Sequence, residues 1–187
     1  MDEKPYDFVR VHGNRIDLCV LRTDEEAVNL YTKWINDESI NIFIGSSDTV
    51  SYRYSQEDWA TQERDPDTCT FSIVDKTTRN LIGICTSNLI CGSARTANLS
   101  ICIGEKNYQD KGYGTEVMKL LIRFAFYQQN AHRIELFVNS NNKRAIKCYE
   151  KCGLKIAGCR HEASYYDGKY SDLYLMELLK SDYKENL

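Results

Sequence analysis

Proline is scarce in this 187-residue sequence, and no stretch is rich in glycine and serine. The only prolines are Pro5 and Pro66, so no segment has the composition of a linker between domains. With 42% hydrophobic residues, a chain of this length can bury a sizeable core. We therefore expect a single domain over residues 1–187.

Long apolar segments are absent as well. The first residues, Met1 to Pro5, are polar and no apolar run follows them, and no later run approaches the length of a transmembrane helix. The net charge of −3 disfavours the broad basic surface that nucleic-acid binding requires. We expect a soluble, cytoplasmic protein without a nucleic-acid or membrane partner.

Patterns typical of disulfide frameworks and metal sites are also missing. The sequence has eight cysteines but no C-x-x-C, and Cys85 and Cys102 lie inside apolar runs, which is typical of reduced, buried thiols that act as small hydrophobes. The three histidines are scattered without the spacing of metal ligands, so we expect structural or surface roles and no metal. They are His12, His132 and His161.

Hydrophobic periodicity predicts seven strands and four helices in a mixed sheet. Strands are expected at 15–22, 69–75, 80–89, 96–103, 133–138, 158–166 and 170–178. Helices are expected at 25–36, after an N-cap at Ser55, from the glycine turn described below to about Gln128, and at 142–152 with Gly153 after the end. Asp167-Gly168 predicts a hairpin turn between the last two strands. The element order indicates an α/β fold with antiparallel and parallel parts.

The most informative segment is the glycine turn at 109–115, which lies between the apolar run 99–103 and an amphipathic helix. Gly112 and Gly114 allow the backbone to approach an anion, while the helix N-terminus directs N–H groups and its positive dipole end at it. The turn thus predicts a phosphorylated ligand. The same spacing also suits a helix entry without any ligand, so both interpretations stay open for the turn alone.

A second motif lies downstream of this turn. Together the two resemble the GNAT superfamily of acyl-CoA-dependent N-acetyltransferases, in its ribosomal-protein-alanine and spermidine acetyltransferase branches. The first family motif, Q/R-x-x-G-x-G/A, is matched by Gln109, Gly112 and Gly114. The second, N-x-x-A-x-x-x-Y-E-K-x-G-F, is matched except that Leu154 replaces the final aromatic residue. Its matching residues are Asn142, Ala145, Tyr149, Glu150, Lys151 and Gly153. The likeness extends over about residues 15–178.

The resemblance implies a GNAT-like fold, with six to seven strands splayed at the cofactor site and about four helices. It also implies acetyl-CoA as cosubstrate, with its pyrophosphate on the glycine turn and its pantetheine arm paired with the preceding strand. Lys111 would add charge or be a solvated neighbour, and Asn142 would bind the coenzyme or cap its helix. The implied cofactor-binding residues are Ile101, Cys102, Ile103, Gln109, Asp110, Lys111, Gly112, Tyr113, Gly114, Thr115 and Asn142.

The resemblance also implies a catalytic residue, Tyr149, whose phenol would protonate the leaving thiolate; the alternative is a buried helix aromatic. The general base is not identified, because Asn98 and Phe137 align with positions where relatives often carry glutamate. Glu135 is a candidate base, but a role as a structural partner of Arg133 is favoured, and a water relay would need no dedicated base.

The leading hypothesis is an N-acetyltransferase that transfers an acetyl group directly to a primary amine of a small molecule or a protein N-terminus. The alternatives are a non-catalytic acyl-CoA-binding or regulatory module and, least favoured, a nucleotide- or nucleic-acid-binding protein that uses the same phosphate cradle. Residues 37–66 are expected to help form the acceptor side, through Tyr52, Tyr54, Glu57, Asp58, Trp59, Glu63 and Asp65. A monomer and a homodimer both stay open.

Overall fold

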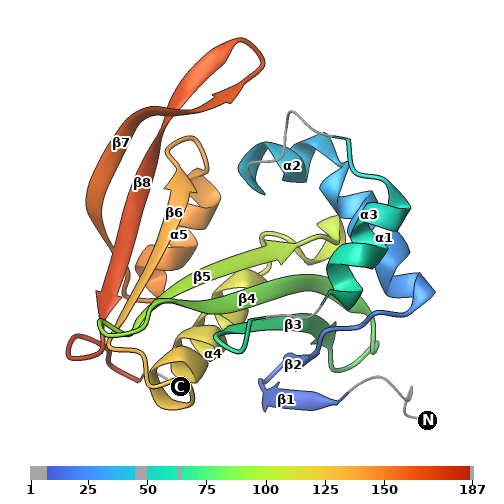
Figure 1. Ribbon diagram of the computed structural model, residues 1–187, viewed down its shortest axis with the longest axis horizontal. Helices are drawn as coiled ribbons and strands as arrows, with labels where there is room; N and C mark the ends of the chain where they lie inside the picture. Colours follow the sequence, from blue (N-terminus) through green and yellow to red (C-terminus); the bar gives the residue numbers. More distant parts are fainter. Residues whose placement is uncertain (1–7, 45–49, 63–64, 186–187) are drawn as a thin grey trace.

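The computed structural model describes residues 8–44, 50–62 and 65–185, which form an eight-stranded mixed sheet and five α-helices (Figure 1). The sheet order is β1-β2-β3-β4-β5-β6-β8-β7. The strands are β1 Val9–His12, β2 Ile16–Val20, β3 Thr68–Asp75, β4 Leu81–Cys91, β5 Thr96–Ile103, β6 Arg133–Asn139, β7 Lys155–Tyr166 and β8 Lys169–Leu179. The helices are α1 Glu25–Ile35, α2 Glu38–Ile44, α3 Arg53–Thr61, α4 Tyr113–Tyr127 and α5 Lys143–Lys151, with a short 3-10 turn η1 at Lys106–Tyr108.

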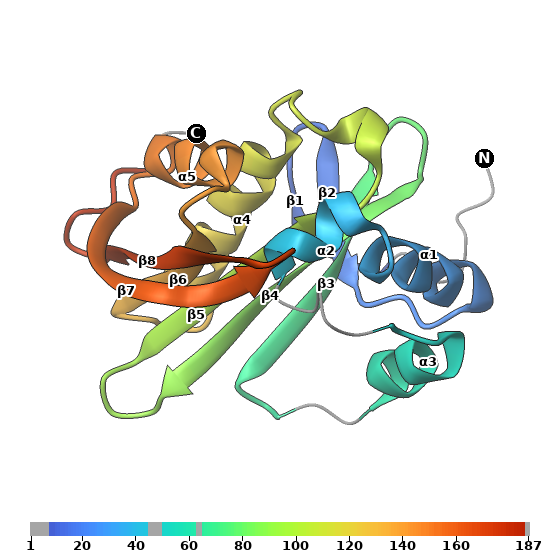
Figure 2. The same ribbon diagram turned by 90° about the horizontal axis from the view of Figure 1, so that it is seen from above.

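The sheet carries hydrophobic clusters on both faces, as the alternation along β4 illustrates. Ile82 and Cys85 belong to the large cluster that packs against α4, whereas Leu81 and Ile84 pack with α1. Neighbouring side chains on a strand point to opposite faces, so Leu81 and Ile82 enter different clusters. A β-bulge between Leu81 and Gly83 then shifts the alternation, which explains why Ile82 and Cys85 share a face although they are three residues apart. Figure 2 shows α4 and α5 on one side of the sheet and α1 and α3 on the other.

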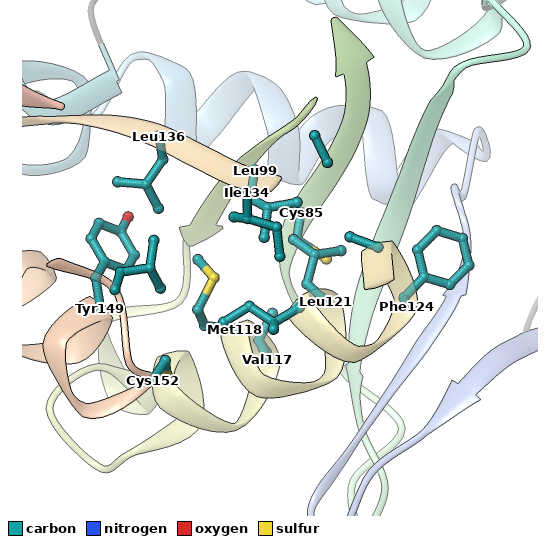
Figure 3. Packing of buried hydrophobic residues seen from close by; sticks show 14 of the residues in the cluster. Cys85, Leu99, Val117, Met118, Leu121, Phe124, Ile134, Leu136, Tyr149 and Cys152 are labelled. Carbon is teal, nitrogen blue, oxygen red and sulfur yellow. The ribbon is translucent and has the colours of Figure 1, made fainter. Parts of the chain in front are cut away.

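The helix α4 is the main apolar element of the larger cluster. Its buried face, predicted from the helical spacing of apolar residues, includes Val117, Met118, Leu121 and Phe124. Figure 3 shows these side chains directed toward residues of β4, β5 and β6.

Within the described residues, no helix is long and apolar enough to cross a lipid bilayer.

Several local predictions are confirmed by the hydrogen bonds and dihedral angles of the element ends. Asp24 caps α1 by accepting the Ala27 N–H at 3.2 Å. Gly153, just after α5, has a φ of +95°, a left-handed conformation in which glycine has no Cβ penalty. The β7–β8 turn has a positive φ at both Asp167 and Gly168, as its sequence predicts.

The predicted element list was incomplete, because β1 and α2 were not expected. Both are short, and α2 buries only Ile40 and Asn41, so its sequence carries little helical periodicity. The predicted N-cap at Ser55 was wrong, because α3 starts at Arg53 with Tyr52 as its N-cap residue.

The expectation that the cysteines are buried thiols was wrong for Cys159, which is exposed. Its strand, β7, lies at the edge of the sheet, where much of its length faces solvent.

Candidate active site

The sheet opens between β5 and β6, which are its only parallel neighbours among the described strands. Their ladder contains three residue pairs and ends at Asn98↔Glu135, whereas β4 stays paired with β5 as far as Ile103. The segment from Leu99 to Ile103 is thus bonded to β4 on one edge, and its other edge faces the opening (Figure 1). This confirms the predicted splay. Such an edge can accept an extended ligand as an added strand.

The end of β5 is fixed against α1 by a close approach. A Cβ on Gly104 would lie 2.0 Å from the indole of Trp34, so any other residue here would force the chain away from the helix. The Trp34 indole N–H donates to Glu105 at 2.9 Å, and Lys33 forms an ion pair with the same carboxylate. These contacts hold the β5 end in place while β6 diverges from it.

The glycine turn connects this strand to α4 through two left-handed residues. Asp110 has a φ of +57° and Gly112 a φ of +83°, and Gly112 is the N-cap residue of α4 without a side-chain cap. Without such a cap, the helix N-terminus offers its N–H groups to an external acceptor. The arrangement therefore fits the predicted phosphate cradle.

Arg15, in the loop between β1 and β2, braces the outside of the turn. Its guanidinium donates to the Lys111 carbonyl at 2.9 Å, pairs with Glu116 at 2.9 Å, and lies 4.3 Å from the ring centroid of Tyr113. The Arg15 contacts lower the pKa of Glu116 against the opposing effect of burial, which is the largest single influence on this carboxyl. Sequence reasoning missed this brace because Arg15 is about a hundred residues from its partners.

Gln109, from the first motif, bonds to protein groups on both sides. Its amide nitrogen donates to the Ile103 carbonyl at 2.8 Å, and its amide oxygen accepts from Arg144 at 2.7 Å. The side chain therefore ties the turn to the end of β5 and to α5. This gives Gln109 a positioning role in addition to any contact with a ligand.

The second motif places α5 along the other side of the opening. Asn142 caps this helix by accepting the Ala145 N–H at 3.1 Å, so the capping alternative for Asn142 is observed. Tyr149 lies on the same helix and is 8% exposed, at the margin of the core near Leu136 (Figure 3). Burial, and to a smaller extent the Cys148 thiol, raises the pKa of Tyr149 well above its usual value. The phenol is therefore protonated at neutral pH, as a proton donor must be, and is a weaker acid than an unperturbed tyrosine.

A second reactive group, the Cys148 thiol, lies beside Tyr149. The Thr115 hydroxyl donates to its sulfur at 3.4 Å. The pKa of Cys148 is lowered, mainly because the Cys152 thiol hydrogen-bonds to it and despite its partial burial. The same interaction raises the pKa of Cys152. One face of α5 thus brings two thiols together next to the glycine turn.

These elements enclose a cleft of about 540 Å³. Ten of the twelve predicted site residues line it, whereas Lys111 and Tyr113 do not. Lys111 is exposed, and the Tyr113 hydroxyl donates to Asp75 at 3.3 Å. The ten lining residues are Ile101, Cys102, Ile103, Gln109, Asp110, Gly112, Gly114, Thr115, Asn142 and Tyr149.

Positive charge reaches the cleft from α5 and not from Lys111. The cationic side chains that line it are Lys143, Arg144, Lys147 and Lys151, all from the one helix. Three of them recur every four residues, which places them on one helical face. That spacing was visible in the sequence and would have identified the basic face.

The opposite wall is formed by α2 and not by α3. Ser39, Ile40, Phe43 and Ile44 line the cleft, so α2 is the part of the 37–66 stretch that reaches it, and the acceptor side stays a prediction. The residues of α3 do not line the cleft.

The aromatic and acidic residues predicted for the acceptor side lie elsewhere. The Trp59 ring packs edge-on against Tyr31, with 5.7 Å between the ring centroids, and Tyr52 stacks on Tyr54, with 5.5 Å between the centroids. The predicted residue Glu63 lies outside the described residues.

The cleft offers little choice of a general base. Glu135 does not line it and instead lies 3.3 Å from Arg133, the structural role favoured from the sequence. Phe137 lines the cleft, so the position where relatives often carry glutamate has no proton acceptor. Among the described residues, the single carboxylate in the lining is Asp110, which lies 3.5 Å from Arg144.

Comparison with known proteins supports this arrangement of strand, glycine turn and helix. The family model described as "Acetyltransferase (GNAT) domain" matches residues 15–155. The chain belongs to the GNAT acetyltransferase family. This membership agrees with the family resemblance of both motifs.

Among curated GNAT relatives, the chain is similar to the uncharacterized N-acetyltransferase p20 of Bacillus licheniformis, with 31% identity over 113 residues. That match covers 60% of this chain and 63% of the relative. It is also 31% identical over 111 residues to a spermidine N(1)-acetyltransferase of Vibrio cholerae, covering 59% of this chain and 64% of the relative. The matched stretches therefore span less than two thirds of either relative.

Solved structures show the same GNAT fold. The spermidine N-acetyltransferase from Vibrio cholerae, in complex with CoA and spermine, superposes with a TM-score of 0.81 at 24% identity, covering 90% of this chain and 98% of that one. A GNAT-family acetyltransferase from Bacillus anthracis gives a TM-score of 0.78 at 15% identity, covering 91% and 98% of the two chains. The fold class predicted from the sequence is thus confirmed.

Proposed function

We propose that this chain is an acetyl-CoA-dependent N-acetyltransferase that transfers the acetyl group directly to a primary amine. The observation that carries the proposal is the single cleft in which the open edge of β5, the uncapped N-terminus of α4 and the Tyr149 phenol meet. Each of these matches a different part of the cosubstrate: an extended amide-containing arm, a pyrophosphate and a thioester.

The residues that would hold acetyl-CoA can be assigned from the lining. Backbone groups from Ile101 to Ile103 would pair with the pantetheine arm, and the N–H groups of residues 109–115 would bind the pyrophosphate. Lys147 and its neighbours on α5 would supply positive charge to the phosphates. Lys111 is a weaker candidate, since its side chain lies outside the lining.

Acyl transfer would use Tyr149 as the general acid. Attack of a neutral amine on the thioester carbonyl gives a tetrahedral intermediate, and its collapse expels a thiolate that the phenol protonates. The proton lost by the amine would pass to water, because the single carboxylate in the described lining, Asp110, is ion-paired with Arg144. Water would in turn return a proton to the Tyr149 phenolate, so the enzyme is restored after each turnover. We propose that this transfer requires no metal ion.

The acceptor would be a small-molecule amine or a protein N-terminus. Spermidine acetyltransferases among the relatives make polyamines the first compounds to examine. The proposal includes a single N-acetyltransferase domain and a cytoplasmic location, where acetyl-CoA is available.

The test is CoA release from acetyl-CoA by the purified chain, with polyamines, aminoglycosides, amino acids and N-terminal peptides as acceptors. We expect turnover with at least one class and saturable binding of acetyl-CoA measured by calorimetry. Binding without turnover across the panel would favour the non-catalytic acyl-CoA module. The absence of both would overturn the assignment of the cleft.

A further inference from the structure

A second group of chemically reactive side chains lies on the β7–β8 hairpin, away from the cleft lining. Cys159 and His161 are two residues apart on β7, so they share one face of the strand. The Cys159 sulfur lies 3.8 Å from the His161 Nδ1, and this nitrogen lies 3.5 Å from an Asp172 carboxylate oxygen on β8. We refer to Cys159, His161 and Asp172 as the hairpin triad. One donor atom from each residue lies within 4.8 Å of the other two.

A β-bulge brings the three side chains together. The pairing of β7 with β8 shifts between Arg160↔Leu173 and Ser164↔Ser171, so residues 161–163 lie opposite Asp172 alone. Within the bulge, Glu162 has a φ of +48° and its N–H donates to Asp172 Oδ1 at 2.9 Å. This bond orients the carboxylate, and Oδ2 is the oxygen that faces His161.

Two of the three separations between the donor atoms are close to those of a tetrahedral zinc site, and the third, from sulfur to oxygen, is within 4.8 Å. Zinc–sulfur and zinc–nitrogen bonds of about 2.3 and 2.0 Å at tetrahedral angles separate sulfur from nitrogen by about 3.5 Å, and nitrogen from oxygen by about 3.4 Å. The observed separations of 3.8 and 3.5 Å need only small side-chain adjustments to reach these values. The Cys159 thiol also hydrogen-bonds to the Asp172 carboxylate, so the three side chains contact one another pairwise.

We propose that the hairpin triad binds one divalent zinc-class ion, with Cys159, His161 and Asp172 as its protein ligands. A thiolate and an imidazole favour Zn²⁺ over Mg²⁺, Ca²⁺ and Mn²⁺, which prefer oxygen ligands. Three protein ligands at an exposed position leave the fourth tetrahedral position to water. The Glu162 N–H that orients Asp172 corresponds to the outer hydrogen bonds that hold metal ligands in place.

The triad is separate from the proposed acyl-transfer site but its strands contact that site. None of the three residues lines the cleft. Arg160, which lies between two of the ligands in sequence, places its guanidinium 5.7 Å from the ring centroid of the cleft residue Phe137. At the far end of the hairpin, the Tyr166 hydroxyl donates to Glu38 of α2. An ion on the triad would therefore stiffen a hairpin that contacts elements on both sides of the cleft.

The site is absent from the sequence-based expectations because His161 has no metal-ligand spacing along the chain. Its nearest candidate partner in sequence is Cys159, two residues before it, and the third ligand comes from the next strand. Only the hairpin register and its bulge bring the three groups together.

The experiment uses the full chain without an affinity tag, stripped with a chelator, reduced, and titrated with Zn²⁺ against a chromogenic chelator and with Co²⁺ by absorption spectroscopy. We expect one Zn²⁺ per chain and a sulfur-to-cobalt charge-transfer band. Cys159→Ser should abolish the band, and His161→Gln and Asp172→Asn should weaken Zn²⁺ binding about tenfold or more. The matched control, His132→Gln, changes an exposed histidine outside the triad. This variant should bind Zn²⁺ with the same affinity as the unmodified chain.

Circular dichroism of each variant separates loss of a ligand from loss of the fold. The proposal is overturned if the folded chain shows no saturable Zn²⁺ binding. It is also overturned if the cobalt band survives Cys159→Ser and disappears in Cys148→Ser, since the ion would then be held by the thiols of α5.

Discussion

The wall of the cleft formed by β5 and the glycine turn differs from the wall formed by α2 in the groups it presents. The first offers main-chain atoms, positioned by close packing such as that of Gly104 on Trp34 and by the bonds of Gln109. The second offers side chains that are partly in solvent, with Phe43 37% and Ile44 39% exposed. Main-chain atoms are the same for any sequence, so a main-chain surface suits a cosubstrate that does not change from one enzyme to the next. Exposed side chains differ between sequences, so the wall that presents them can differ with the acceptor. The donor is therefore easier to assign than the acceptor.

The largest expected effect concerns Tyr149 on the donor side. Tyr149→Phe should lower kcat by about 10²- to 10³-fold, because the thiolate leaves without its proton donor, while the KM for acetyl-CoA changes little. Tyr113→Phe is the matched control, since its hydroxyl contacts Asp75 outside the cleft lining. Steady-state kinetics on both variants test the assignment, which fails if Tyr149→Phe keeps more than half of the activity.

A smaller effect is expected of CoA on the rate at which iodoacetamide alkylates Cys148. Its lowered pKa leaves more thiolate at neutral pH than an ordinary cysteine has, so the midpoint of the rate–pH profile should lie below that of a model thiol. Cys152, with a raised pKa, should react slowly. CoA at ten times its Kd should slow labelling of Cys148 about tenfold.

Mass mapping of the labelled peptides identifies the thiol that reacts. Cys148→Ser should lose the fast phase of alkylation and its protection by CoA. Equal labelling rates with and without bound CoA would show that the coenzyme does not cover this thiol, and the donor side would then need reassignment.

A still smaller effect distinguishes the two sources of positive charge. Lys147→Gln should raise the Kd for CoA about threefold to fivefold at low salt, and less at high salt, because the charge is exposed. Lys111→Gln, outside the lining, should leave the Kd within twofold. Calorimetry at two ionic strengths measures both, and the opposite ranking would restore Lys111 as the phosphate ligand.

The smallest effect is expected on the α2 wall. Phe43→Ala should raise the KM for the amine acceptor about threefold through loss of apolar contact, with the Kd for CoA unchanged. Tyr54→Ala, which removes an exposed ring stacked on Tyr52, should change neither constant. A change in CoA affinity with Phe43→Ala would erase the distinction between the two walls.

Much of the wall that we propose binds the acetyl donor was accessible from the sequence, because its geometry depends on local rules. A left-handed glycine before a helix, an asparagine cap and a tyrosine on one helical face are each set by neighbours a few residues away. The predictions that were incomplete or wrong involve distant partners or weak periodicity. Arg15 reaches the turn from the other end of the chain, and α2 is held by packing of Ile40.

By itself, the sequence determined the mixed α/β fold, the two motifs and their order, because hydrophobic period, turn chemistry and capping act over short stretches of chain. Tertiary structure alone decided that β5 and β6 separate after Asn98, that the basic face of α5 lines the cleft, and that α2 closes the cleft. It also decided that Cys159, His161 and Asp172 meet, through a bulge in the register of two strands. The physical reason is the same in each case: strand register and packing relate residues that no local pattern connects.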